Sequence, residues 1–251
     1  MPIVTLLTDF GLGDSYVAEM KGVLASRSPG VSMVDVTHQL HPGDVRAAAY
    51  LLGRTWHRFP AGTVHLVVVD PGVGTGRASL ALTAAGHAFV GPDNGVFTSV
   101  LGRRDGLVAL PTPDGASPTF HGRDLFAPAA AALASGYPLD ALGTTLAVEP
   151  QALVPPETKY EGKSIVGEVI YVDRFGNLVT NFTADLTPSY ATFEAEDAEI
   201  GPRLRTFADV PPGGLLAYLG SGGFIEIAVR DGSAARRLGL GVGGRVRARL
   251  G

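Results

Sequence analysis

Apolar and polar positions follow two alternating patterns in the first part of the chain. Short runs rich in Val, Leu and Ile, which are typical of buried strands, occupy residues 3–7, 32–36 and 64–69. Between them lie two segments with apolar side chains at helical spacing, residues 15–26 and 44–56. The alternation continues through residues 78–83, 88–90, 95–101 and 125–135. It predicts an α/β fold, with a parallel or mixed sheet flanked by helices.

The pattern changes in the second part of the chain. Prolines and charges without apolar periodicity fill residues 151–163, which we interpret as a linker between an α/β domain at 1–150 and a second domain at 164–251. The second domain shows short apolar runs separated by turn residues, at 167–172, 177–181, 191–194, 215–219, 224–229 and 245–249. No long helical pattern interrupts these runs, so we expect a small all-β barrel or sandwich.

Composition narrows the class of protein. With 45% hydrophobic and 18% charged residues, the 251-residue chain has enough apolar side chains for a sizeable core. A formal net charge of -4 argues against a nucleic-acid-coating surface, and the absence of cysteine excludes disulfides and thiolate chemistry. The N-terminus has a strand pattern where a signal peptide would have a basic and then an apolar region, and no apolar run is long enough for a membrane span. We expect a cytoplasmic protein.

The segment from Val67 to Arg77 carries the first candidate chemistry. An apolar run ends at Asp70, a glycine-rich turn follows, and Arg77 stands where it can reach back to the carboxylate. Because ligands of open α/β sheets bind at the carboxyl ends of the strands, Asp70 is a candidate site residue. The alternative is an ordinary salt bridge that closes a turn.

Other polar residues also follow apolar runs. Asp9, His38 and Asp93, the last followed by Asn94, stand at such ends and could share one cleft with Asp70. Each by itself has the simpler interpretation of a turn or capping residue. The histidines and carboxylates near residues 38–44 also permit a metal site, but their spacing enforces no ligand set, so we expect no metal.

Three further segments are ambiguous when taken singly. His121 precedes a predicted helix, whose dipole disfavours the charged imidazole, although it could simply close the loop. Asn177 can donate and accept like the edge of a nucleobase, yet the sequence around it also suits a hairpin turn. The glycine-rich loop at 220–223, which feeds the strand containing Glu226, could wrap a ligand or merely turn.

Five motifs taken in order resemble the S-adenosylmethionine hydroxide adenosyltransferases, a family related to the fluorinases and chlorinases. They are Thr8-Asp9-Phe10-Gly11, Asp70-Pro71-Gly72-Val73-Gly74, Gly91-Pro92-Asp93-Asn94-Gly95, Phe120-His121-Gly122-Arg123-Asp124 and Asp173-x-Phe175-Gly176-Asn177. The resemblance covers nearly the whole chain. It implies an N-terminal α/β domain, a C-terminal β-barrel, and a homotrimer with the site between subunits.

The resemblance also implies catalytic residues. The hydrolases of the family carry an Asp–Arg–His set that corresponds to Asp70, Arg77 and His121. The halogenating relatives carry Tyr, Thr and Ser where this chain has Asp70, Val73 and Gly122, so the chain resembles a hydrolase. A water held by this set would attack C5′ of the ribose of S-adenosylmethionine, releasing adenosine and methionine without a metal or other cofactor.

Substrate-binding residues follow from the same resemblance. Asp9 would hold the ribose hydroxyls, Asn177 the adenine, and Asp173 with Ser221 the amino-acid end of the substrate. We also expect substrate contacts from Asp93, Asn94, Phe120, Phe175 and Glu226. One departure is Gly43, which stands where the family usually has an aromatic residue, so one wall of the pocket is reduced.

Three alternatives to a hydrolase stay open at this point. A halide-dependent adenosyltransferase is one, although Asp70 would repel an anion. A non-catalytic module that binds adenosine or S-adenosylmethionine is the second, and a metal-dependent phosphoesterase is the third. Adenosine and S-adenosylmethionine are the only expected partners besides further copies of the chain, with neither nucleic acid nor membrane among them.

Overall fold

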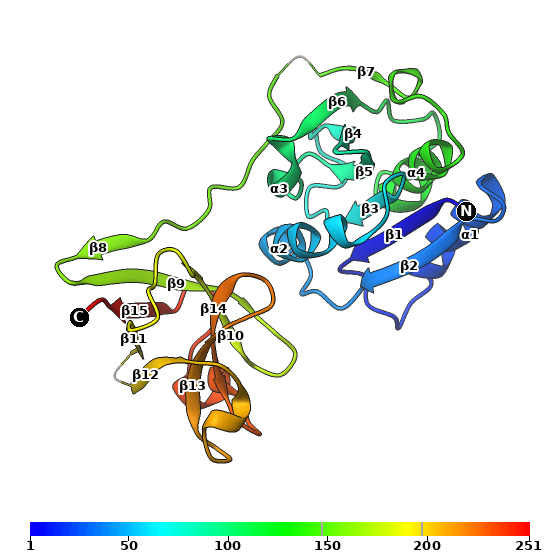
Figure 1. Cartoon of the computed structure of the whole chain (residues 1–251). Helices are drawn as coiled ribbons and strands as arrows, with labels where there is room; N and C mark the ends of the chain where they lie inside the picture. Colours follow the sequence, from blue (N-terminus) through cyan, green and yellow to red (C-terminus); the bar gives the residue numbers. More distant parts are fainter. Residues whose placement is uncertain (147, 197) are drawn as a thin grey trace. The chain divides into compact units, whose positions relative to one another are not determined.

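The computed structural model describes residues 1–146, 148–196 and 198–251 (Figure 1). Its internal contacts divide the chain into two compact units, Met1–Leu153 and Val154–Gly251.

The first unit is built on a mixed sheet of seven strands. Their order is β2-β1-β3-β5-β4-β6-β7, in which β2, β1, β3 and β5 are parallel and the last three strands are antiparallel to their neighbours. The strands are β1 (Ile3–Thr8), β2 (Ser32–Thr37), β3 (Val64–Val68), β4 (Ser79–Ala84), β5 (His87–Pro92), β6 (Arg104–Ala109) and β7 (Thr144–Thr145). The parallel strands end at one edge, which is where such sheets bind ligands.

Helices cover both faces of this sheet (Figure 1). One face packs against α1 (Tyr16–Arg27) and α4 (Ala127–Ala134), whose Met20, Leu24 and alanines share a buried cluster with Val4 and Leu6 of β1. The other face packs against α2 (Val45–Thr55) and α3 (Thr98–Leu101) through a second cluster. Alternate side chains of each strand point to opposite faces, so both clusters draw on the same strands.

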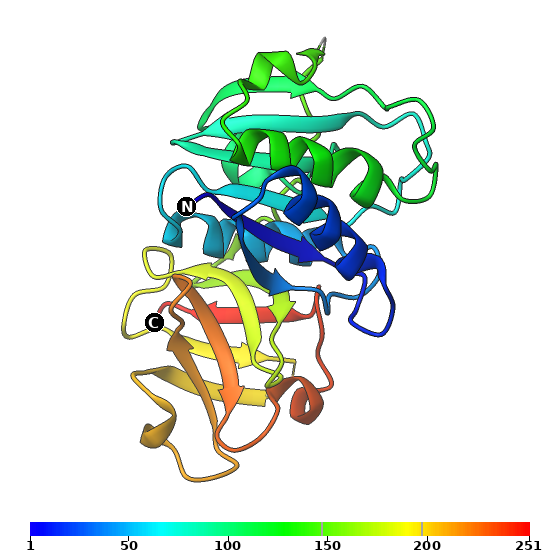
Figure 2. The same cartoon turned by 90° about the vertical axis from the view of Figure 1, so that its right-hand side faces the viewer.

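The second unit is a closed barrel of seven strands (Figure 2). The order β10-β14-β13-β12-β11-β15-β9 closes because β9 also pairs with β10, and β8 pairs with the outer edge of β9. The elements are β8 (Lys159–Glu161), β9 (Ser164–Val172), β10 (Leu178–Thr183), β11 (Thr192–Ala195), β12 (Ala198–Leu204), β13 (Leu215–Leu219), β14 (Phe224–Val229), the short helix α5 (Ala234–Leu238) and β15 (Arg245–Arg249). The closed barrel encloses a core of mainly Ile, Val, Phe and Ala side chains.

The predicted fold class is confirmed in both parts. Individual elements differ where sequence signals conflict. Strand β6 was not predicted because it begins with Arg104 and Asp105 and contains Gly106, all unusual in strands. Strand β12 contains Gly201, at φ 89°, and Pro202, which normally mark a turn. Strand β8 lies within the segment interpreted as a linker.

Candidate active site

Asp70 and Arg77 form a buried, two-point ion pair. Strand β3 is buried throughout, and Asp70 lies two residues beyond its end, at the ligand-binding edge of the sheet. Arg77 Nε donates to Asp70 Oδ1 at 2.8 Å, and Nη2 donates to Oδ2. The two side chains are only 8% and 4% exposed, so water does not compete for this contact.

The Arg77 guanidinium uses all five of its N–H donors. Nη1 donates to the Ala78 carbonyl at 3.1 Å and to Ser79 Oγ at 2.7 Å. Nη2 has its second contact with His121 Nδ1, at 3.1 Å. A planar guanidinium held by five hydrogen bonds has one orientation, so Arg77 holds Asp70 and His121 in a defined geometry relative to each other.

His121 is neutral and has its proton on Nε2 in this arrangement. A guanidinium can only donate, so Nδ1 must be the accepting nitrogen. Burial lowers the pKa of His121 below its usual value, and the charge of Arg77 lowers it further. The imidazole therefore presents Nε2–H as a donor at neutral pH.

The loop that contains Arg77 packs closely against the loop that contains His121, and Gly74 makes this close packing possible. Gly74 has φ +77°, and a Cβ there would lie 2.7 Å from the carbonyl oxygen of Pro118. Only glycine permits this conformation together with this close approach. Close packing of the two backbones brings together residues that are 44 positions apart in the sequence.

Asp9 lies next to the same loop. Its Oδ2 accepts the backbone N–H of Gly43 at 2.6 Å, and a Cβ on Gly43 would contact the ring of Pro71 at 3.6 Å. Asp9 is thereby oriented beside the segment that leads from Asp70. Gly43 has φ +77°, which explains why a side chain is disfavoured at this position in this chain.

Phe120 belongs to an aromatic group at the same edge of the sheet. Its ring lies 6.0 Å from that of Phe10 and 5.2 Å from that of Tyr16, in edge-to-face geometry. Phe120 directly precedes His121, so this group provides an apolar wall beside the charged set. Phe10 and Tyr16, which the sequence analysis did not single out as site residues, complete that wall.

Three other polar residues from strand ends have internal partners. Asp93 is buried, its Oδ1 accepts the Gln151 N–H at 2.7 Å, and burial raises its pKa although Arg77 opposes the shift. Asn94 Nδ2 donates to the Val69 carbonyl at 2.8 Å, immediately before Asp70. His38 pairs with Thr8 at 2.8 Å inside the unit. These contacts shape the sheet edge, while the predicted substrate role of Asp93 and Asn94 stays a prediction.

The barrel contains a pocket of about 530 Å³, a size in the range of small-molecule sites. Three predicted residues line it: Asp173, Phe175 and Asn177. Residues not singled out from the sequence complete the lining, namely Phe207, Tyr218, Val229, Asp231 and Gly232. The rings of Phe207 and Tyr218 lie 5.1 Å apart and form an aromatic wall. They are separated in sequence, and no local motif identifies either of them.

Asp173 orients Asn177 within this pocket. Asp173 Oδ1 accepts the backbone N–H groups of Phe175 and Asn177, both at 2.9 Å, and Oδ2 accepts Asn177 Nδ2 at 2.8 Å. A carboxylate only accepts, so the amide nitrogen of Asn177 must face Asp173 and the amide oxygen is directed elsewhere. Phe175 is 76% exposed and lines the same pocket, so its ring is accessible to a ligand there.

Glu226 supports the glycine-rich loop that contains Ser221. It is buried on β14 and accepts a hydrogen bond from the Tyr218 hydroxyl. A Cβ on Gly220 would lie 1.9 Å from Glu226 Oε1, so the loop backbone passes directly over this carboxylate. Glu226 therefore connects the pocket wall at Tyr218 to the loop at Ser221.

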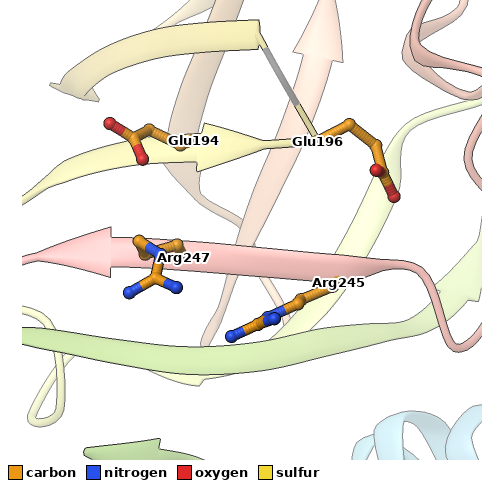
Figure 3. A pocket seen from close by; sticks show the side chains of 4 residues that line it. All are labelled: Glu194, Glu196, Arg245 and Arg247. Atoms are coloured by element: carbon orange, nitrogen blue, oxygen red, sulfur yellow. The ribbon is translucent and has the colours of Figure 1, made fainter. Parts of the chain in front are cut away.

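A second, smaller pocket on the barrel is lined by charges of both signs. Figure 3 shows Glu194 and Glu196 projecting from β11 and its end, and Arg245 and Arg247 from β15. Both arginines donate to Glu161, at 2.9 Å in each case. We interpret this surface as an ion-pair network. Within the described residues, no three His, Asp or Glu side chains are grouped as metal ligands, and no helix is long and apolar enough to cross a membrane.

Comparison with known proteins identifies the family. The model of the SAM hydroxide adenosyltransferase N-terminal domain matches residues 4–143, and that of the C-terminal domain matches residues 167–247. Two proteins named (R)-S-adenosyl-L-methionine hydrolase are similar over nearly the full length of both chains. The one from Thermus thermophilus is 46% identical over 97% of this chain and 98% of its own, and the one from Salinispora arenicola is 44% identical over 100% and 98%.

More distant relatives are named fluorinase, such as a Nocardia brasiliensis protein that is 30% identical over 100% of this chain and 97% of its own. The crystal structure of an uncharacterized conserved protein from Thermotoga maritima has a TM-score of 0.90 at 35% identity and covers 98% of this chain and 99% of its own. Both domain models together span most of the sequence. This chain therefore belongs to the SAM hydroxide adenosyltransferase family.

Proposed function

We propose that this protein hydrolyses S-adenosylmethionine to adenosine and methionine by attack of a water on C5′ of the ribose. The observation that carries the proposal is the buried set of Asp70, Arg77 and His121, in which every donor of the guanidinium is used. A module that only binds its ligand gains little from such a set, because burying charges is costly. Its relatives named (R)-S-adenosyl-L-methionine hydrolase support the same conclusion.

The reaction requires a water to lose a proton as it attacks. A C–O bond forms at C5′ while the C5′–S bond breaks, and the sulfonium takes the bonding pair and leaves as the neutral thioether of methionine. One proton from the water remains to be accepted. A positioned base contributes about 10² to 10⁴ in rate to such a step.

Asp70 is the proton acceptor in this proposal. Arg77 stays protonated in proteins and cannot accept, and the free electron pair of His121 Nδ1 is occupied by Arg77 Nη2. The Asp70 carboxylate accepts one hydrogen bond from Arg77 on each oxygen and has electron pairs left for a water. His121 Nε2–H holds the water oxygen, and the adjacent guanidinium stabilises the developing hydroxide.

The substrate is held by residues from both units. Asp9 accepts the ribose hydroxyls with the electron pairs that the Gly43 N–H leaves unused. The amide oxygen of Asn177, directed away from Asp173, accepts from the adenine amino group. Phe120, Phe175, Phe207 and Tyr218 supply flat apolar contacts, and the loop with Ser221, supported by Glu226, receives the amino-acid end.

The role of Asp173 is refined by its contacts. Both of its oxygens accept N–H groups of its own turn, three in total. The main role of Asp173 is therefore to orient Asn177. Its remaining electron pairs accept from the substrate amine. Asp93 and Asn94 act by shaping the end of β3 and of its neighbour β5 around Asp70.

The functional assembly in this proposal is a homotrimer in the cytoplasm. Candidate residues occur in both units of the chain, and the site would combine the first unit of one subunit with the barrel of its neighbour. Sedimentation equilibrium would measure the assembly. At a substrate concentration below KM, where Asp70→Ala and Asn177→Ala should each be slow, mixing the two variants would raise the rate above that of either one only if subunits share sites.

The decisive experiment uses oxygen-18 water. The protein is incubated with each of the two sulfonium diastereomers of S-adenosylmethionine, with and without chelator and chloride, and the nucleoside is identified by mass spectrometry. We expect adenosine labelled at O5′, unaffected by chelator, and formed from the diastereomer that the names of the relatives specify. Chlorinated nucleoside, chelator sensitivity or no turnover would each contradict the proposal.

A further inference from the structure

The motif that contributes His121 also contains Arg123 and Asp124, to which the reaction assigns no role. Residues Gly122–Phe126 form a single π-helical turn between His121 and α4. Such turns are uncommon and occur frequently at functional sites. The support for this turn comes from a chain of polar contacts that begins on α1.

Arg123 joins two carboxylates from different elements. Its Nε and Nη2 donate to Asp124 Oδ1 and Oδ2 at 2.7 and 2.9 Å, and its Nη1 donates to Glu19 Oε2 on α1 at 2.8 Å. The guanidinium carbon lies 5.0 Å from the centre of the Phe120 ring. One planar side chain thus contacts the residue before His121, the turn after it and the neighbouring helix.

Both ends of the contact chain are anchored to backbone or to a helix terminus. Asp124 Oδ2 accepts the N–H of Ser117 at 2.9 Å, which closes the loop that includes Pro118. Glu19 Oε1 accepts the Ser15 hydroxyl at 2.7 Å at the start of α1. The loop therefore has one support from Gly74 at Pro118 and another from α1 through Arg123.

We infer that Arg123 is a positioning residue for the reaction, and that it holds His121 against Arg77 by tying the 117–124 loop to Glu19 of α1. The inference rests on the proposed function for its kinetic consequence, whereas the geometry of His121 can be measured without substrate. In this inference, Arg123 maintains the 3.1 Å hydrogen bond from Arg77 Nη2 to His121 Nδ1.

The test compares three variants. Arg123→Gln removes the connection between the two carboxylates. Glu19→Ala removes only the connection to α1, at a half-buried helical position where alanine has a high helix propensity. Arg104→Gln is the matched control, because Arg104 is similarly exposed, pairs with Glu149 and lies on β6 of the same unit. Initial rates over a range of substrate concentrations, which give kcat and KM, and ¹⁵N NMR of labelled histidines are measured for each.

We expect Arg123→Gln to lower kcat about 10- to 100-fold, because small displacements of a catalytic group have effects of this size, with a much smaller change in KM. Glu19→Ala should lower kcat about 3- to 10-fold for the same reason. Arg104→Gln should match the wild type. In the NMR spectra, the His121 pKa should move up toward its ordinary value in both Arg123→Gln and Glu19→Ala, because the imidazole gains access to water.

The direction in which Glu19→Ala changes the His121 pKa shows whether the variant acts by moving His121 or only by removing a nearby charge. The charged groups acting on His121 are Arg77, Asp70 and Asp124. Removing a carboxylate would lower a histidine pKa through charge alone, whereas loosening the loop raises it. A wild-type His121 pKa and wild-type kcat in Glu19→Ala and Arg123→Gln would overturn the inference.

If Arg123→Gln does not fold, Glu19→Ala decides the question by the same two measurements. If the wild type releases no adenosine, the proposed function fails, and the NMR comparison still determines whether Arg123 positions His121.

Discussion

The buried set around Arg77 and the pocket of the barrel differ in burial, charge and internal hydrogen bonding. The set around Arg77 is buried, charged and saturated with internal hydrogen bonds before any ligand arrives. The barrel pocket is open and aromatic, with Phe175 76% exposed. The first arrangement fixes charges for a reaction, since preorganised groups need no rearrangement in the transition state. The second offers flat surfaces and one oriented amide, which suits recognition of a planar ring.

This contrast predicts that substitutions in the first region change kcat and that substitutions in the second change KM. The largest expected effect is at Asp70. Asp70→Ala should lower kcat by about 10³-fold, as loss of a positioned base does, and leave adenosine binding by calorimetry largely intact.

Removing Asp70 leaves Arg77 buried without its partner, which costs stability. Circular dichroism therefore accompanies the kinetics, and Asp70→Asn, which keeps the shape of the side chain, repeats the measurement. Asp105→Asn, at an exposed aspartate of β6, is the control in the same unit. Full activity in either Asp70 variant would contradict the assignment of the two regions.

The second prediction concerns acid stability, which should differ between the two units. All six histidines lie in the first unit, and burial lowers the pKa of His65 to about 3, with His87 adding to the effect. The native state keeps His65 neutral, while the unfolded chain takes up a proton below about pH 6.5. The unfolded state thus binds more protons, and stability falls as the pH falls from that value toward 3.

Between pH 6 and pH 4 this one residue should remove about 2 to 3 kcal/mol from the free energy of unfolding of the first unit. Trp56, the only tryptophan, packs against His87 in that unit, with ring centroids 5.2 Å apart, so its fluorescence in urea reports the change. His65→Gln should flatten the pH dependence. An equal dependence in the variant would show that other groups cause it.

The third prediction belongs to the barrel pocket. Phe207→Ala should raise KM about 10-fold with kcat nearly unchanged, since stacking of an aromatic side chain on a base contributes about 1 to 3 kcal/mol. Tyr190, an exposed aromatic of the same unit that does not line the pocket, provides the control as Tyr190→Ala. If Phe207→Ala lowered kcat without changing KM, the proposed difference between a catalytic region and a substrate-binding region would be wrong.

The smallest expected effect is on the charged surface of β15. Glu161→Gln removes the negative charge that pairs with both Arg245 and Arg247, and these ion pairs are partly exposed to solvent. Exposed pairs contribute about 0 to 1 kcal/mol each, so the free energy of unfolding should fall by no more than about 1 kcal/mol, less at high salt. Any loss of activity in this variant would indicate that the charged pocket takes part in function.

Much of the fold follows from local pattern. The alternation of strands and helices up to residue 135, and the short strands after residue 164, predict the α/β sheet and the barrel that the structure contains. Strands β6 and β12 were not predicted, because each contains residues that by themselves indicate a turn or an exposed segment. Their pairing with neighbouring strands outweighs this local preference.

The sequence by itself determined the fold class, the family resemblance and the identity of Asp70, Arg77 and His121 as candidates, because motifs and periodicity are local properties of the chain. Only the tertiary structure decided that Arg77 is saturated, that His121 accepts through Nδ1, and that Phe207 and Tyr218 share a wall. Each of these depends on the approach of segments far apart in sequence. Such contacts arise from packing and hydrogen-bond geometry, which no single segment encodes.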